Sequence, residues 1–119
     1  MSTQTFVVRE DFDVIVSRSA VRDLARSIGM GTADQARISL AASSAARALG
    51  IGRTHQGKIT IQDVQREDQL GICVICEVED LDGPPAEEKL ADARAMTDEL
   101  SIDELSARQV KVTLIKWSR

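Results

Sequence analysis

Two stretches in the first half of the chain repeat apolar residues every three or four positions, which is the period of an amphipathic helix. The first covers residues 11–28, and Gly29 suits the end of a helix. The second covers residues 32–49, where small residues fill most of the interior, and Gly50 follows. We therefore expect two helices. Their inward positions are Val14, Ser17, Val21, Leu24 and Ile28 in the first, and Ile38, Ala41, Ala45 and Leu49 in the second.

The start of the second helix has a recognisable polar signal. Thr32 is of the type that caps a helix through its hydroxyl group, and Asp34 suits the positive end of the helix dipole. We expect Thr32 to be the capping residue.

The pattern then changes to the alternation of β-strands. Residues 58–64 alternate, and residues 71–78 are apolar on both faces, which is typical of a central strand. Residues 65–70 are expected to form the hairpin loop between them. Residues 5–8 and 110–117 also read as strands.

The third helix is expected over residues 86–98, with Leu90, Ala93 and either Met96 or Thr97 facing inward. Residues 99–105 either extend this helix or form a strand that pairs with the last one. Both alternatives give an α+β fold in one domain over residues 1–119. It is a two-layer sandwich, with helices on one face of a mixed, mainly antiparallel sheet.

Composition narrows the class of protein. The 119 residues are 43% hydrophobic and 29% charged, as in folded domains, and the net charge of -4 argues against nucleic acid as the main partner. The sequence contains neither an apolar run of membrane-spanning length nor a signal peptide pattern. We expect a cytoplasmic protein that does not contact membranes.

Cysteine and histidine offer little chemistry in this sequence. Cys73 and Cys76 have the spacing of a redox pair but lie within a predicted strand, so we expect buried free thiols. His55 is the only histidine and has no partner ligands nearby, so no metal site is expected. The glycines of residues 50–57 are not followed by the lysine of a phosphate loop.

An acidic cluster follows the predicted central strand, at Glu77, Glu79, Asp80 and Asp82. By composition alone, it is typical of a solvated strand end and turn.

Three stretches together resemble a known family: "GTADQARISLAASSAARAL", "EVEDLDG" and "LSARQVKVTLIKWSR". They are similar to the serine kinases and anti-sigma factors of bacterial partner switching, of the RsbT and RsbW types, within the GHKL (histidine-kinase-like) ATPase superfamily. The resemblance runs nearly end to end. It implies a bacterial regulator of transcription in stress responses.

The resemblance also implies where catalytic residues belong. The second helix of these kinases begins T-x-x-Q-A-R, as Thr32, Gln35 and Arg37 do here. It then carries a glutamate that acts as a base or positions water and, four residues later, an asparagine that holds Mg²⁺. This chain has Ser44 and Ala48 at the matching positions, so we expect no catalytic residues and no bound cofactor.

Two further family elements are altered. An Asp-x-Gly-x-Gly turn contacts adenine in the family. Here only Asp80, Asp82 and Gly83 remain as candidates, and Pro84 and Pro85 follow. The family's glycine-rich lid over the triphosphate matches only residues 86–89. Four residues span at most about 14 Å, which is too short for such a lid.

We therefore expect a degenerate regulator that acts by binding proteins. The resemblance suggests a STAS-domain antagonist, a sigma factor or a partner-switching phosphatase as partner, and homodimers are also possible. Arg18, Arg22 and Arg26 share a helical face and form the candidate docking patch. The first alternative is an active serine kinase with unusual use of MgATP. The second is a protein that binds another small ligand in the vacated pocket.

Overall fold

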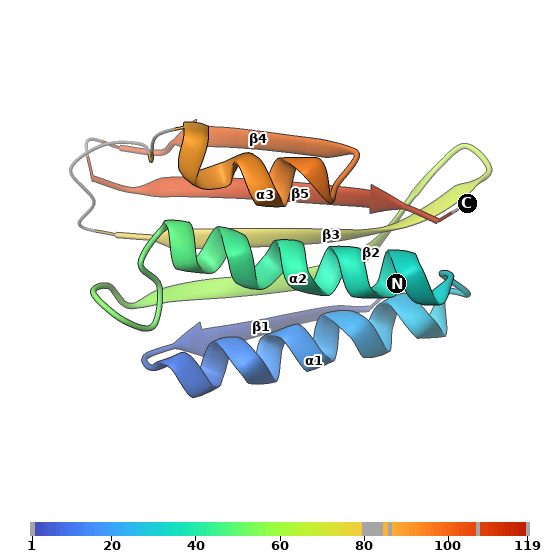
Figure 1. The fold of residues 1–119 in the computed structure, drawn as a ribbon, viewed down its shortest axis with the longest axis horizontal. Coiled ribbons are helices and arrows are strands. Elements are labelled where there is room, and N and C mark those ends of the chain that lie inside the picture. The colour runs from blue at the N-terminus through green and yellow to red at the C-terminus, as the bar shows by residue number, and fades with distance from the viewer. Residues whose placement is uncertain (1, 80–84, 86, 107, 119) are drawn as a thin grey trace.

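The computed structural model describes residues 2–79, 85, 87–106 and 108–118. Its elements follow in the order β1 (Thr3–Val8), α1 (Asp11–Ser27), α2 (Thr32–Ala48), β2 (Gly57–Arg66), β3 (Gln69–Val78), the 3-10 helix η1 (Glu87–Leu90), α3 (Ala91–Ala95), β4 (Glu99–Glu104) and β5 (Val110–Trp117). The strands form one sheet in the order β1-β2-β3-β5-β4, and each neighbouring pair is antiparallel. The helices cover one face of this sheet, with α2 between α1 and α3 (Figure 1). The expected α+β sandwich is confirmed, and β3 is the central strand.

The ends of the first two helices are set by local hydrogen bonds. The Asp13 carboxylate accepts the backbone N–H groups of Arg9 and Glu10 at the start of α1, at 2.9 and 3.2 Å. Gly29 follows α1 with φ of 83°, as expected of a terminating glycine. The expectation that Thr32 caps α2 is wrong. The N-cap residue is Gly31, whose backbone is extended. Its carbonyl accepts the first hydrogen bond of the helix, from the N–H of Gln35 at 2.9 Å.

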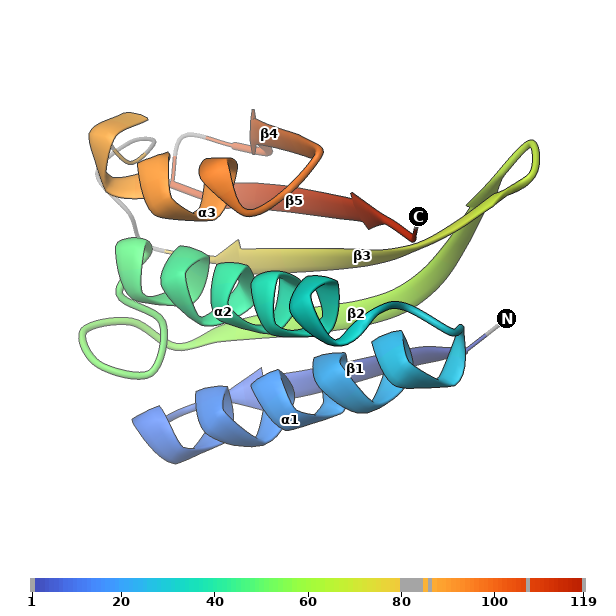
Figure 2. The same cartoon turned by 45° about the vertical axis from the view of Figure 1, so that its right-hand side comes forward.

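The β2–β3 hairpin is longer than the sequence pattern indicated. Pairing continues to Arg66 and Gln69, so the turn consists of Glu67 and Asp68 rather than residues 65–70. Glu67 has φ of 55°, which a tight turn of this kind requires. The hairpin projects beyond the helical layer (Figure 2), so its polar residues face solvent and gave no strand signal.

The third helix is shorter than expected. It ends at Ala95, because the N–H of Asp98 already donates to the carbonyl of Ile115 in the sheet, at 2.9 Å. Residues 99–104 form β4 against β5, which settles the open alternative in favour of a hairpin. Leu90 and Ala93 are buried as expected, and Met96 packs partly against the core.

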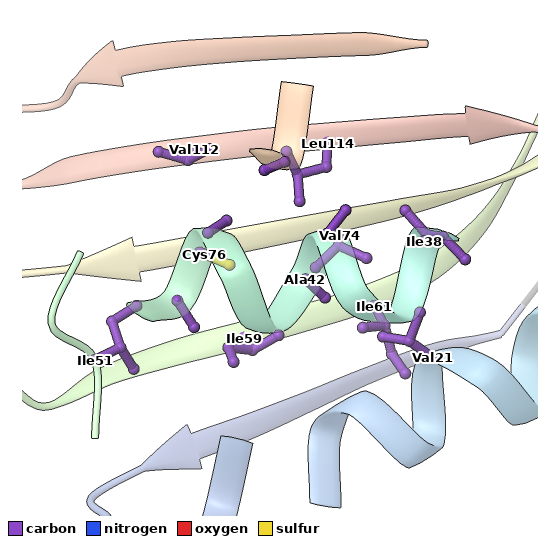
Figure 3. Close-up of a cluster of buried hydrophobic side chains, with 14 of the residues drawn as sticks. Val21, Ile38, Ala42, Ile51, Ile59, Ile61, Val74, Cys76, Val112 and Leu114 are labelled. Atoms are coloured by element: carbon purple, nitrogen blue, oxygen red, sulfur yellow. The ribbon is translucent and has the colours of Figure 1, made fainter. Parts of the chain in front are cut away.

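The core lies between α2 and the sheet (Figure 3). The small residues of α2 face this core, which lets the helix lie close to the central strands. Buried on the two sides are Ile38, Ala41, Ala42, Ala45 and Ala46 from α2, and Ile59, Ile61, Val74, Cys76 and Leu114 from the sheet. No helix in the described part of the chain is long and apolar enough to cross a membrane.

Candidate functional site

The outer side of α2 borders a hollow of about 360 Å³ between the three helices. Ser44, at the position where the resemblance implies a catalytic glutamate, lines this hollow and is half-buried. Ala48, one turn further on, packs partly against the core and offers no ligand atom. The hollow is lined by Arg18, Leu40, Ser43, Ser44, Arg47, Asp92, Ala95 and Met96.

A second hollow, of about 230 Å³, lies beside the first, and the two share Arg18, Ser43 and Arg47. We call it the α1–α2 groove. It is lined by Asp11, Val14, Ile15, Arg18, Ser43, Arg47, Ile51 and Arg53. The two hollows therefore form one continuous depression across the outer face of the helical layer.

Three arginine side chains line this groove: Arg18, Arg47 and Arg53. Arg53 pairs with Asp11 at 3.0 Å, so these two charges largely cancel. Within the described residues, neither Arg18 nor Arg47 forms an ion pair or hydrogen bond through its side chain. Two uncompensated guanidinium groups, one from α1 and one from α2, therefore border the same depression.

The predicted arginine stripe of α1 is divided by the fold. Arg18 is half-buried in the groove, whereas Arg22 and Arg26 are exposed further along the helix. Arg26 makes a solvent-exposed pair with Asp23 at 3.5 Å. Arg47 of α2 lines the groove together with Arg18. Sequence reasoning missed Arg47, because the two residues belong to different helices and the sequence pattern does not show how those helices pack.

Asp92 is a second residue that the sequence did not single out. It comes from the first turn of α3 and lines the same hollow as Ser44. No sequence signal marks it, since α3 is a short separate helix whose position depends on the packing of Leu90 and Ala93.

The three candidate adenine-site residues, Asp80, Asp82 and Gly83, lie outside the described residues. The connection that contains them is short, because β3 ends at Val78 and η1 begins at Glu87. Of the four residues at the expected lid position, the described ones belong to η1, and the Glu87 carboxylate pairs with Arg94 at 3.0 Å.

Parts of the first and third stretches of the family resemblance meet at the start of α2, the end away from Ser44, and have structural contacts there. The Gln35 side-chain amide donates to the Met30 carbonyl at 2.8 Å and holds the loop between α1 and α2. Lys116 of β5 is buried, and its ammonium group lies 3.6 Å from Asp34 and 3.8 Å from Asp98. We call Asp34, Lys116 and Asp98 the α2–β5 clamp.

The electrostatics of this clamp favour the charged form of Asp34. Desolvation raises the pKa of its carboxyl group, but the hydrogen bond from Arg37 and the charge of Lys116 outweigh it, so the pKa lies below the ordinary value.

The cysteines behave as the sequence predicted. Cys76 belongs to the core, whereas Cys73 is buried but lies outside the core cluster, and both are free thiols. Burial raises the pKa of Cys76 to about 12. It also raises the pKa of Cys73, although a hydrogen bond with Gln62 acts in the opposite direction.

The loop after α2 does not form a phosphate cradle. The N–H groups of Arg53, Thr54 and His55 all donate to the carbonyl of Gly50, at 3.0 to 3.2 Å, and so are not free for an anion. His55 is half-buried and shares a hydrogen bond of 2.9 Å with Thr54. The described part of the chain contains no cluster of three or more potential metal ligands.

Comparison with known proteins agrees with the residue-level resemblance. No protein-family model matches the chain. It is 26% identical to the serine/threonine-protein kinase RsbT of Bacillus subtilis (strain 168) over 134 aligned positions, which cover 100% of both chains. The chain is thus a distant homologue of this kinase over its full length.

Proposed function

We propose that this chain is a protein-binding regulator of the partner-switching type, and that it has lost MgATP-dependent phosphoryl transfer. The single observation that carries this proposal is the outer side of α2, where Ser44 borders the hollow and Ala48 follows one turn later. Distant homology to a partner-switching kinase supports the regulatory class.

Phosphoryl transfer requires a ligand for Mg²⁺ and a group that orients the attacking oxygen. The α2 residues around the hollow are Leu40, Ser43, Ser44 and Arg47, and none of them is a carboxylate or an amide. The methyl group of Ala48 cannot coordinate a cation. This helix therefore supplies neither requirement.

The length of the chain independently supports the proposed loss of MgATP-dependent phosphoryl transfer. The alignment to RsbT spans 134 positions against the 119 residues of this chain, so the kinase has residues where this chain has none. The short connection between β3 and η1 is a natural place for part of that difference, and it leaves little chain to cover a triphosphate.

The proposed partners are a STAS-domain antagonist, a sigma factor or a partner-switching phosphatase in the cytoplasm. Docking uses the depression between the helices, where Arg18 of the expected patch and Arg47 of α2 are both lining residues. Arg22 and Arg26 are exposed and lie outside this depression. A homodimer is compatible with this role.

Calorimetric titration with MgATP tests the loss of chemistry. We expect no heat of binding for the natural chain at micromolar nucleotide. The double variant Ser44→Glu/Ala48→Asn measures whether the α2 substitutions alone abolished binding. Micromolar affinity in the natural chain contradicts the proposal. Titration with purified STAS-domain proteins tests the docking role, which fails if none of them binds.

One observation favours the alternative of an active serine kinase. Asp92 lines the same hollow as Ser44 and is a carboxylate that a nucleotide bound there would meet. Under this alternative, the chain transfers phosphate from ATP to a STAS-domain antagonist, and Asp92→Asn abolishes the transfer. Absence of transfer by the natural chain rejects it.

A further inference from the structure

Both α1 and α2 carry large apolar side chains that are exposed to solvent. Of the seven large hydrophobic residues that are exposed in the described part of the chain, four lie on these two helices. They are Phe12 at 64%, Ile15 at 48%, Val16 at 39% and Leu40 at 49% of full exposure. Of these, Ile15 lines the α1–α2 groove and Leu40 lines the adjoining hollow, so a partner that enters the depression meets exposed apolar side chains from both helices.

The arrangement of the helices gives this surface a shape. The helices α1 and α2 run antiparallel and side by side (Figures 1 and 2). The α1–α2 groove lies between them, with Ile15 on one bank and Arg47 on the other. Leu40 borders the adjoining hollow together with Arg18. A depression between two packed helices suits the ridge of a third helix.

The charge of the groove is opposite to that of the chain. The chain as a whole carries -4, yet the α1–α2 groove is lined by three arginines, Arg18, Arg47 and Arg53, and by one acidic residue, Asp11. Asp11 is neutralised by Arg53, and Asp92 lies on the α3 side. Charge complementarity therefore calls for carboxylates on the partner.

We propose that the depression formed by the α1–α2 groove and the adjoining hollow binds an acidic amphipathic helix of a partner protein. Leucine-type side chains of that helix contact Ile15 and Leu40, and its carboxylates pair with Arg18 and Arg47. This inference rests on the proposed protein-binding function and names the chemistry of its partner. A second copy of the chain does not fit by the same face, because a two-fold contact would bring like charges together.

The probe is a fluorescent helical peptide of about 18 residues, with leucines on one face and glutamates on both flanks. A matched peptide has glutamine in place of each glutamate. We expect the acidic peptide to bind the natural chain about tenfold more tightly than the neutral one in fluorescence anisotropy, and the difference to shrink as salt is raised.

Charge reversal locates the site. The variant Arg18→Glu/Arg47→Glu is expected to lose at least about tenfold in affinity for the acidic peptide. The matched control Arg22→Glu/Arg26→Glu changes the net charge equally but alters exposed residues outside the groove, so it is expected to lose only about twofold. Circular dichroism melts verify that both variants fold.

A carboxylate introduced into the depression tests whether the peptide binds there, and it leaves both arginines in place. Ser44→Glu puts a negative charge beside Arg18 and Arg47 and is expected to weaken binding of the acidic peptide. Ser44→Gln has similar size without charge and is expected to leave binding unchanged.

Three outcomes overturn the inference: equal binding of the two peptides, equal loss in the two double variants, or displacement of the peptide by a short single-stranded oligonucleotide with higher affinity. The MgATP titration is interpreted independently of the peptide experiments. If MgATP does not bind and the peptide also fails, the inference is wrong while the proposed loss of chemistry stands. If MgATP binds, the proposed function is wrong whatever the peptide does.

Discussion

At the scale of single residues, the alternation of a strand decides what each side chain can do. Cys73 and Cys76 are three positions apart, so they point to opposite faces of β3 and cannot form a disulfide with each other. Both are buried, and burial raises the pKa of both thiols. Their chemistry is that of small hydrophobic residues.

We expect both thiols to be almost unreactive in the folded protein. With a pKa of about 12, Cys76 has almost no thiolate at pH 8, and its side chain is inaccessible. Labelling with a chromogenic disulfide reagent at pH 8 measures this. Both thiols are expected to react promptly in guanidinium chloride and only slowly without it. Rapid labelling of Cys76 without denaturant contradicts the structure.

Gly71 illustrates a residue whose lack of a side chain is required by packing. A Cβ atom there would lie 2.7 Å from the Trp117 ring and 2.7 Å from the carbonyl oxygen of Lys116. Trp117 is held over this glycine, since its indole N–H donates to Glu99 at 2.9 Å and Arg66 lies 4.7 Å from its ring centroid.

Gly71→Ala is expected to lower the free energy of unfolding by about 1–3 kcal/mol, because the added methyl group forces the ring or the strand to move. Urea denaturation measures the change. Gly31→Ala is the matched control, since nothing lies within 4 Å of its added Cβ atom. Equal stability of the two variants argues against the packing described.

At the scale of elements, the α2–β5 clamp joins the start of α2 to the end of the sheet. Lys116 is 8% exposed and lies between Asp34 and Asp98. The carboxylate of Asp98 also accepts the N–H of Trp117 at 2.7 Å. Removal of one charge from such a nearly buried set leaves the ammonium group less well compensated.

The clamp predicts loss of stability in acid. The folded pKa of Asp34 lies below its ordinary value of 3.8, so its contribution is present above that pH and is lost as the pH falls through the folded pKa. Asp34→Asn is expected to lower the free energy of unfolding by about 1–3 kcal/mol at pH 7. It is also expected to make the free energy of unfolding fall less steeply as the pH drops below 3.8.

Urea denaturation over a pH series measures both effects. Asp23→Asn is the matched control, since the Asp23–Arg26 pair is exposed and is expected to contribute at most about 0.5 kcal/mol. If Asp34→Asn behaves like this control, the clamp does not stabilise the fold.

At the scale of the whole molecule, one sheet and one layer of helices share a single core cluster. Urea unfolding is therefore expected to be one cooperative transition, with far-ultraviolet circular dichroism and the fluorescence of Trp117 changing together. Trp117 reports from the sheet and the dichroism largely from the helices. Two separated transitions would contradict a single domain over residues 1–119.

The sequence by itself determined most of the fold, because the spacing of buried residues within each helix or strand follows from that element's own residues. The spacing of apolar residues located α1, α2, β3 and β5. The small residues of α2 predicted that this helix packs closely on its neighbours. Its resemblance to partner-switching kinases also predicts that Ser44 and Ala48 stand where those kinases have catalytic residues. These are properties of one element at a time, which its own residues specify.

Only the tertiary structure decided what depends on distant segments. It made residues 99–104 a strand, because the edge of β5 was open to pair, and it extended the β2–β3 hairpin through a polar stretch. It also placed Arg47 and Arg18 in the lining of one groove, and Asp92 and Ser44 in the lining of one hollow. Contacts between elements depend on how those elements pack, and the spacing of apolar residues within one element does not show this.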